Sequence, residues 1–160
     1  MNQDDFAQAR RFIAADITRE IQLSKCNSQG ELGPGITPGA GNFLAALGLL
    51  CYTEFGGKLR FGHTRPNEND ASGKNFSSFF DLLGPVYKSF REEHNVYDIF
   101  RCGLAHEYYV KKNCTIYMTA GVQAAGIGID ASGKFYVVVE QYYLALMKAF
   151  DDLEQHRFPS

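Results

Sequence analysis

The stretch that decides the fold is Val96–Lys112, which reads VYDIFRCGLAHEYYVKK. Its apolar residues recur at intervals of three and four, the pattern of one buried face of an α-helix. Asn95 precedes the stretch as an N-cap, and Lys111 and Lys112 suit the negative C-terminal end of a helix. The pattern predicts a helix over 96–112 with one face in the core. The expected buried residues are Val96, Ile99, Phe100, Gly103, Leu104 and Tyr108.

The same helix carries several chemically active side chains. At about 100° per residue, Arg101 and Tyr108 lie one above the other, and His106 is rotated by roughly 140° from Arg101. Gly103 lies between the rows and permits close approach of another backbone. We therefore expect Arg101 and His106 to converge over one patch if a second helix lies there. A second row of side chains consists of Cys102, His106 and Tyr109.

The segment from Arg101 to Tyr108, RCGLAHEY, resembles the R-x4-H-x-Y motif of the HEPN superfamily of small all-helical bundles. The resemblance covers mainly the motif helix and the helix-rich sequence before it. It implies a homodimer that brings two motifs together. Many members are metal-independent endoribonucleases of toxin–antitoxin, CRISPR-linked or phage-defence systems, and others are non-catalytic. The chain departs from the motif at Cys102, where many members carry Asn or another polar residue.

The resemblance implies that Arg101 and His106 are the catalytic residues of an RNA-cleaving enzyme. A histidine can take the proton of a ribose 2′-hydroxyl or give one to the leaving 5′-oxygen, because it titrates near neutrality. A permanently charged arginine can hold the phosphate and stabilise its transition state. The implied product is a 2′,3′-cyclic phosphate, formed without a metal. The expected supporting residues are Cys102, Glu107, Tyr108 and Tyr109.

Tyr108 carries a second implication. In HEPN toxins that are paired with minimal nucleotidyltransferase antitoxins, the tyrosine of the motif is nucleotidylated. The resemblance therefore implies that a partner nucleotidyltransferase attaches AMP to Tyr108 and blocks the site.

Two other interpretations of these residues stay open. An Arg and a His on one helix can form hydrogen bonds across a bundle, which describes a non-catalytic dimeric interaction module. A pocket between helices can instead bind a nucleotide or another small molecule. An enzyme requires Arg101 and His106 to be accessible in a cleft at a dimer interface, whereas an interaction module predicts that both are buried and fully hydrogen-bonded.

Composition and charge limit the class of protein. The chain has 160 residues, of which 45% are hydrophobic and 14% aromatic, which indicates one folded domain over 1–160. A net charge of −2 gives no overall attraction to nucleic acid, so RNA contacts require a local patch. The notable basic cluster lies at 58–65 and can contact RNA phosphate or be an ordinary solvated connector. The candidate RNA contacts are Lys58, Arg60, His63 and Arg65.

The cysteine and histidine patterns argue against a bound metal. The four cysteines are widely spaced and the histidines match no zinc-binding motif, so we expect neither a metal nor a cofactor. The N-terminal segment is acidic and amphipathic, unlike a signal peptide, and no apolar run reaches the length of a membrane span. We therefore expect a cytoplasmic protein, and a bacterial one if the resemblance holds.

The rest of the chain predicts a mainly α fold of four to five helices, which the resemblance implies form an up-and-down, HEPN-like bundle. Helices are expected over 4–25, 43–55, 76–93 and 140–155, with loops over 27–41 and 62–74. The first helix is expected to bury one apolar stripe, which consists of Phe6, Ala9, Ile13, Ile17 and Ile21. Asn42 and Asn75 are expected as N-caps, Gly56-Gly57 as the end of the second helix, and Gly84-Pro85 as a break in the third.

A small antiparallel β element is expected over 114–139. Its segments are rich in β-branched and aromatic residues. Asp130-Ala-Ser-Gly133 predicts a hairpin turn, with Gly133 available for a positive φ.

Overall fold

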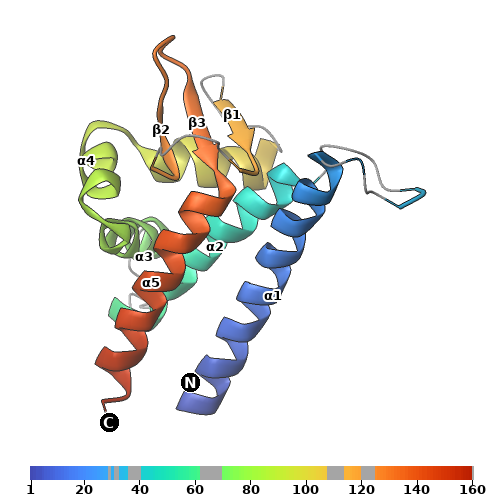
Figure 1. The fold of residues 1–160 in the computed structure, drawn as a ribbon. Helices are drawn as coiled ribbons and strands as arrows, with labels where there is room; N and C mark the ends of the chain where they lie inside the picture. The colour runs from blue at the N-terminus through green and yellow to red at the C-terminus, as the bar shows by residue number, and fades with distance from the viewer. Residues whose placement is uncertain are drawn as a thin grey trace.

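The computed structural model describes residues 1–28, 30, 33–35, 41–61, 70–107, 114–119 and 125–159. This part of the chain is mainly helical and carries a small three-stranded sheet, as predicted (Figure 1). The elements in chain order are α1 (Gln3–Ser28), α2 (Asn42–Phe61), α3 (Ala71–Phe80), the 3₁₀ turn η1 (Asp81–Leu83), α4 (Pro85–Glu93), η2 (Tyr97–Glu107), β1 (Cys114–Tyr117), β2 (Ile127–Ile129), β3 (Phe135–Val138) and α5 (Val139–Arg157).

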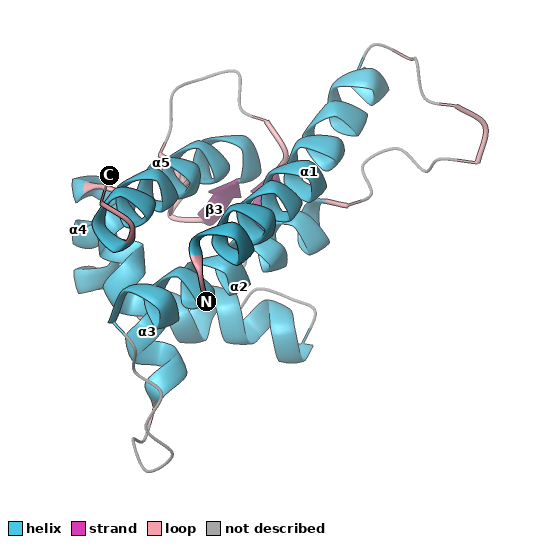
Figure 2. Ribbon diagram, turned by 90° about the horizontal axis from the view of Figure 1, so that it is seen from below, coloured by secondary structure: helices cyan, strands magenta, loops and turns pink. Residues whose placement is uncertain are grey.

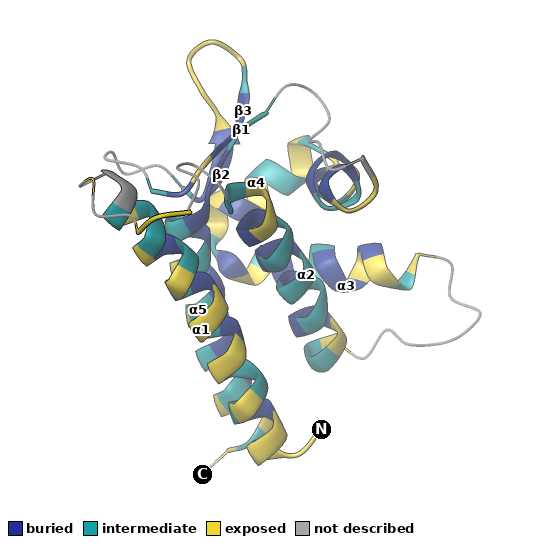
Figure 3. Cartoon of the chain, turned by 90° about the vertical axis from the view of Figure 1, so that its right-hand side faces the viewer, coloured by how far each residue is buried: buried dark blue, intermediate teal, exposed yellow. Residues whose placement is uncertain are grey.

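The long helices α1 and α5 run in opposite directions, so both chain termini lie at the same end of the molecule (Figures 1 and 2). The sheet lies at the other end, where β3 continues directly into α5. Buried residues recur along the helices as bands, with exposed residues between them (Figure 3). Among the described helices, none offers a stretch that is long and apolar enough to cross a membrane.

The apolar stripe predicted for α1 is confirmed. Phe6, Ile13, Ile17 and Ile21 are all buried, and Ala9 is half-buried. The helix begins beside Asn2, whose Oδ1 accepts a hydrogen bond from the backbone N–H of Asp5 at 2.8 Å. One polar side chain thus satisfies an otherwise unpaired N–H of the first turn, and the stripe anchors α1 to the core.

Helix α2 extends beyond the predicted end at Gly56-Gly57 and continues to Phe61. Both glycines are buried because α3 packs directly on them. A Cβ on Gly56 would meet the Phe79 ring, and a Cβ on Gly57 would overlap the backbone carbonyl of Asn75. The prediction of a helix end was wrong, because here the glycines serve close helix packing.

The prediction that Asn42 and Asn75 are N-caps was also wrong. Helix α3 begins at Ala71 behind Asp70, whose side chain accepts a hydrogen bond from the backbone N–H of Gly73 at 3.2 Å. Asn75 is buried within α3. Asn42 lies in α2, and its Nδ2 donates to the carbonyl of Ile116 at 3.1 Å, which ties the start of α2 to β1.

The predicted break at Gly84-Pro85 is confirmed. Gly84 has φ +138°, which favours glycine, and Pro85 occupies the first turn of α4, where its missing N–H costs nothing.

The sheet has strand order β1-β3-β2 and mixed direction. Strands β2 and β3 form the predicted antiparallel hairpin, whose turn has Gly133 at φ +80° and Asp130 Oδ1 accepting from the backbone N–H of Ser132 at 2.8 Å. The antiparallel expectation was wrong for β1, which pairs parallel to β3 from Cys114↔Phe135 to Tyr117↔Val138. The hairpin places β3 between the other strands, and no tight turn joins β1 to β3, so nothing forces them to be antiparallel.

Two buried tyrosines complete the core between the sheet end and the helices. Tyr142 on α5 is fully buried, and its hydroxyl lies 2.8 Å from Thr53 Oγ1 on α2. The Tyr87 hydroxyl accepts a hydrogen bond from the backbone N–H of Gly126 at 3.0 Å. Burial raises the pKa of Tyr87 to about 12 and also raises the pKa of Tyr142. Both groups therefore stay neutral and serve the packing of α5.

Candidate functional site

The motif helix is η2, and its hydrogen-bond pattern makes it a π-helix of 11 residues instead of the expected α-helix. Asn95 caps it as predicted, because Asn95 Oδ1 accepts a hydrogen bond from the backbone N–H of Asp98 at 3.3 Å. π-Helical segments are rare and occur frequently at functional sites. The predicted buried residues that the structure describes are confirmed, namely Val96, Ile99, Phe100, Gly103 and Leu104.

The π geometry changes the relation between Arg101 and His106. A π-helix closes its hydrogen bonds over five residues, so two positions five residues apart complete little more than one turn. In an α-helix the same two positions would be rotated by roughly 140°. Arg101 and His106 therefore start one turn apart on neighbouring parts of the helix surface, closer together than the sequence suggested.

Arg101 is half-buried and tied to α2. Its Nε donates to Glu54 Oε2 at 3.0 Å, and its guanidinium carbon lies 5.9 Å from the centroid of the Tyr97 ring. Burial lowers the pKa of the Arg101 guanidinium, but Glu54 and its other neighbours together raise that pKa above its usual value. Arg101 thus keeps its positive charge, and Glu54 orients its guanidinium group.

His106 lies in a different environment. Its side chain is exposed, and it forms no hydrogen bond or ion pair with any residue that the structure describes. The neighbouring Cys102 is half-buried. An exposed imidazole that is not bound to a protein partner can exchange protons with a substrate.

Arg101 opens onto a pocket of about 390 Å³ between α2, α3 and η2, which we name the Arg101 pocket. Its charged lining residues are Arg101 and Glu54 together with the exposed Lys58. Burial raises the pKa of the Cys51 thiol, an effect that nearby Arg101 only partly offsets, so this thiol is neutral and a poor nucleophile. The described residues that line the pocket are Cys51, Glu54, Phe55, Lys58, Ala71, Ser72, Asn75 and Arg101.

The remaining predicted site residues divide into three groups. Lys58 and Arg60 lie in the last turn of α2, where Lys58 lines the Arg101 pocket and the Arg60 guanidinium lies 5.8 Å from the Phe61 ring centroid. Glu107 is the last described residue of η2, and its side chain lies outside the description. The others, His63, Arg65, Tyr108 and Tyr109, lie outside the described residues.

Sequence reasoning missed Glu54, although the sequence held a signal for it. Glu54 is the only acidic residue in α2, a helix that is apolar on nearly every side. A lone carboxylate in such a helix is costly to bury unless a cation pairs with it. The partner, Arg101, lies 47 residues further along the chain, so the pair itself required the structure.

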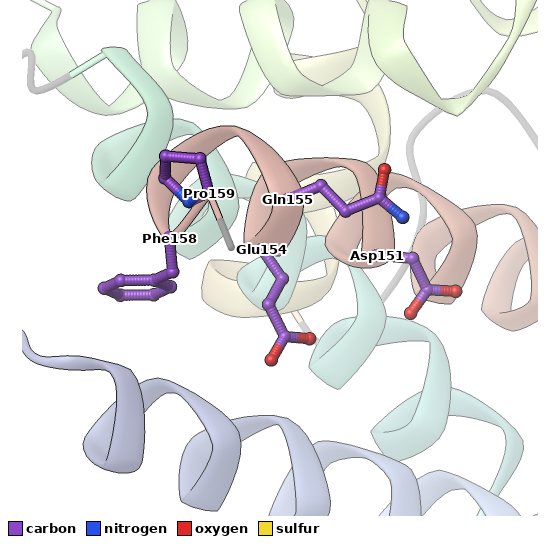
Figure 4. Close-up of a pocket in the computed structure, with 5 residues that line it drawn as sticks. All are labelled: Asp151, Glu154, Gln155, Phe158 and Pro159. Carbon is purple, nitrogen blue, oxygen red and sulfur yellow. The ribbon is translucent and has the colours of Figure 1, made fainter.

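A larger pocket of about 680 Å³ lies at the C-terminal end of α5 (Figure 4). Asp151 and Glu154 line it, but Arg10 of α1 forms ion pairs with both carboxylates, at 2.6 Å to Glu154 Oε2. The lining residues that the structure describes include neither histidine nor cysteine. We therefore assign the candidate site to the Arg101 pocket and His106.

The described residues contain no group of three or more His, Cys, Asp or Glu side chains arranged to hold a metal ion. Cys26, Cys51, Cys102 and Cys114 are free thiols. No protein-family model, curated protein or solved structure matches this chain.

Proposed function

We propose that this protein is a HEPN-type, metal-independent endoribonuclease of a bacterial toxin–antitoxin or defence system, with Arg101 and His106 as its catalytic residues. The observation that supports this proposal best is the arrangement of the two motif residues. An exposed His106 lies one turn beyond Arg101, which Glu54 holds in the lining of the Arg101 pocket. This pairs a proton-transfer group with an anion-binding group, as cleavage of a phosphodiester requires.

In the proposed reaction, His106 takes the proton of a ribose 2′-hydroxyl, and the resulting oxygen attacks the adjacent phosphorus. The bond to the 5′-oxygen breaks, which leaves a 2′,3′-cyclic phosphate and a 5′-hydroxyl. Arg101 stabilises the extra negative charge on the phosphate oxygens. We further propose a cytoplasmic homodimer, in which His106 of the partner subunit protonates the leaving oxygen.

A non-catalytic dimeric helical interaction module, or a nucleotide-binding module, is the alternative. The ion pair between Arg101 and Glu54 favours it, because a structural arginine also requires a carboxylate partner when it is half-buried. The exposure of His106 favours the enzyme, because the interaction module predicts a His106 that is buried and hydrogen-bonded across the bundle.

Cleavage of RNA by purified protein in EDTA tests the proposal. We expect wild type to cleave, and His106→Ala and Arg101→Ala to be about 10²- to 10⁴-fold slower, the usual range for loss of a general acid or base. His156→Ala is the matched control, because His156 is also an exposed histidine on a helix but lies in the last turn of α5 and is not among the described residues that line the Arg101 pocket. Full cleavage by His106→Ala would contradict the proposal. A wild type that is as inactive as the variants would favour the interaction module.

The proposed partner is a nucleotidyltransferase antitoxin that modifies Tyr108. Intact-mass measurement after co-expression with a neighbouring nucleotidyltransferase should show an AMP adduct that the Tyr108→Phe variant lacks. An unmodified wild-type mass would contradict this regulation without affecting the proposed cleavage.

A further inference from the structure

Two half-buried arginines in this protein are held in different ways. The guanidinium of Arg91 binds Asp81 through two nitrogens, with Nε 2.5 Å from Asp81 Oδ1 and Nη2 2.8 Å from Asp81 Oδ2. Arg101 gives only its Nε to Glu54 and forms no hydrogen bond through Nη1 or Nη2 to the described residues. The two pairs are similarly buried, with side-chain exposures of 28% and 25% against 21% and 20%. The two pairs therefore differ in the guanidinium nitrogens that the carboxylate binds: Nε and Nη2 in Arg91, and Nε alone in Arg101.

The donors that Glu54 leaves available belong to a residue that lines the Arg101 pocket. Among the described lining residues, Arg101 and Lys58 are positive and Glu54 is negative, which leaves one net positive charge on this part of the pocket. One net positive charge matches an internal phosphodiester, which carries one negative charge, better than a doubly charged terminal phosphate. At about 390 Å³ the pocket is at the small end of the range for ligand sites, a size for one nucleotide unit.

We propose that the Arg101 pocket binds a single internal phosphodiester of a nucleic acid strand through Arg101 Nη1 and Nη2 and Lys58, and that Glu54 is the positioning residue that orients the guanidinium. The assignment of this strand as the RNA substrate rests on the proposed ribonuclease function. Glu54 then has two opposing effects. It reduces the affinity of the pocket for phosphate, and it fixes Arg101 in the geometry that stabilises the transition state.

Binding of a short single-stranded deoxyoligonucleotide tests the pocket without turnover, because the probe lacks the attacking 2′-hydroxyl. We expect Arg101→Ala to bind about tenfold or more weakly, as loss of a charge-assisted contact predicts. Lys58→Ala should bind about threefold more weakly and show a salt dependence shallower by about 0.7 in log–log slope. Glu54→Gln should bind about fivefold more tightly, since it removes the negative charge from the pocket.

Asp81→Asn is the matched control for Glu54→Gln, because it removes the carboxylate charge from an equally buried arginine pair outside the pocket. It should leave the affinity unchanged. Inorganic phosphate and a mononucleotide with a terminal phosphate should both bind more weakly than the oligonucleotide. Unchanged affinity in Arg101→Ala, or equal effects of Glu54→Gln and Asp81→Asn, would overturn the proposal.

Cleavage kinetics separate positioning from a merely structural role. With RNA as substrate, Glu54→Gln should lower KM and lower kcat, a split that loss of folded protein does not produce. An unchanged kcat with a lower KM would overturn the positioning role. If neither the wild type nor any variant cleaves RNA, but the changes in oligonucleotide affinity follow the prediction, the pocket assignment stands and the ribonuclease proposal fails.

Discussion

Replacement of Gly57 by alanine is expected to destabilise the protein by about 3 kcal/mol, the upper part of the range for overpacking a core. The added methyl group would overlap the backbone carbonyl of Asn75, and a backbone atom cannot move aside as the end of a flexible side chain can. The gain in helix propensity on replacing a helical glycine by alanine is only about 1 kcal/mol and does not offset this overlap. The measurement is the free energy of unfolding in urea.

Gly48→Ala is the control within the same helix. A Cβ at Gly48 would lie 3.6 Å from the Tyr52 ring and 3.7 Å from Ile17, which is ordinary van der Waals contact. The propensity gain should therefore appear as a stabilisation of up to about 1 kcal/mol. Opposite signs at the two glycines would support the close crossing of α2 and α3, and equal stability of Gly57→Ala and wild type would contradict it.

Phe150→Ala should have a comparable or larger effect, a loss of about 3–5 kcal/mol in the free energy of unfolding. Phe150 on α5 is buried, and its ring contacts Phe6 of α1, Phe55 of α2 and Phe79 of α3, with ring centroids between 5.4 and 6.4 Å apart. Truncation would leave a cavity at the junction of four helices.

Leu144→Ala is the matched truncation on the same helix, because Leu144 is 57% exposed. Its effect should stay within about 0.5 kcal/mol. Thermal or urea unfolding of both variants measures the contrast. A loss below about 1 kcal/mol for Phe150→Ala would contradict the assignment of Phe150 to the centre of the core.

The sequence predicted the parts of the fold that local chemistry determines. The apolar stripe of α1, the break at Gly84-Pro85 and the turn at Asp130–Gly133 all follow from residue spacing or from the backbone preferences of Gly and Pro. These features require only neighbouring residues, so the sequence contains the information that they need.

The errors arose where distant parts of the chain decide the structure. Gly56-Gly57 has the composition of a helix end, and only the packing of α3 shows that it is a helix crossing. The direction of β1 depends on the order of strands in the sheet, which the segment itself does not encode. The π-helical hydrogen bonds of η2 leave no mark in an apolar spacing that an α-helix would also show.

The candidate site was predicted only in part, because some of its residues come together through contacts between distant parts of the chain. Arg101 and His106 were found from a motif within one helix, and the structure describes both at the protein surface or at a pocket. Glu54 and Ser72 join the pocket from other helices. Their proximity to Arg101 results from helix packing, so no local pattern could reveal it.

The chemical nature of the RNA ends tests the proposed function most directly. Wild-type protein should cut RNA in the presence of EDTA and leave a 2′,3′-cyclic phosphate and a 5′-hydroxyl, and a substrate with 2′-deoxy residues throughout should resist cleavage. Cleavage that requires an added metal, or products with a 5′-phosphate and a 3′-hydroxyl, would contradict a mechanism in which His106 activates the 2′-hydroxyl.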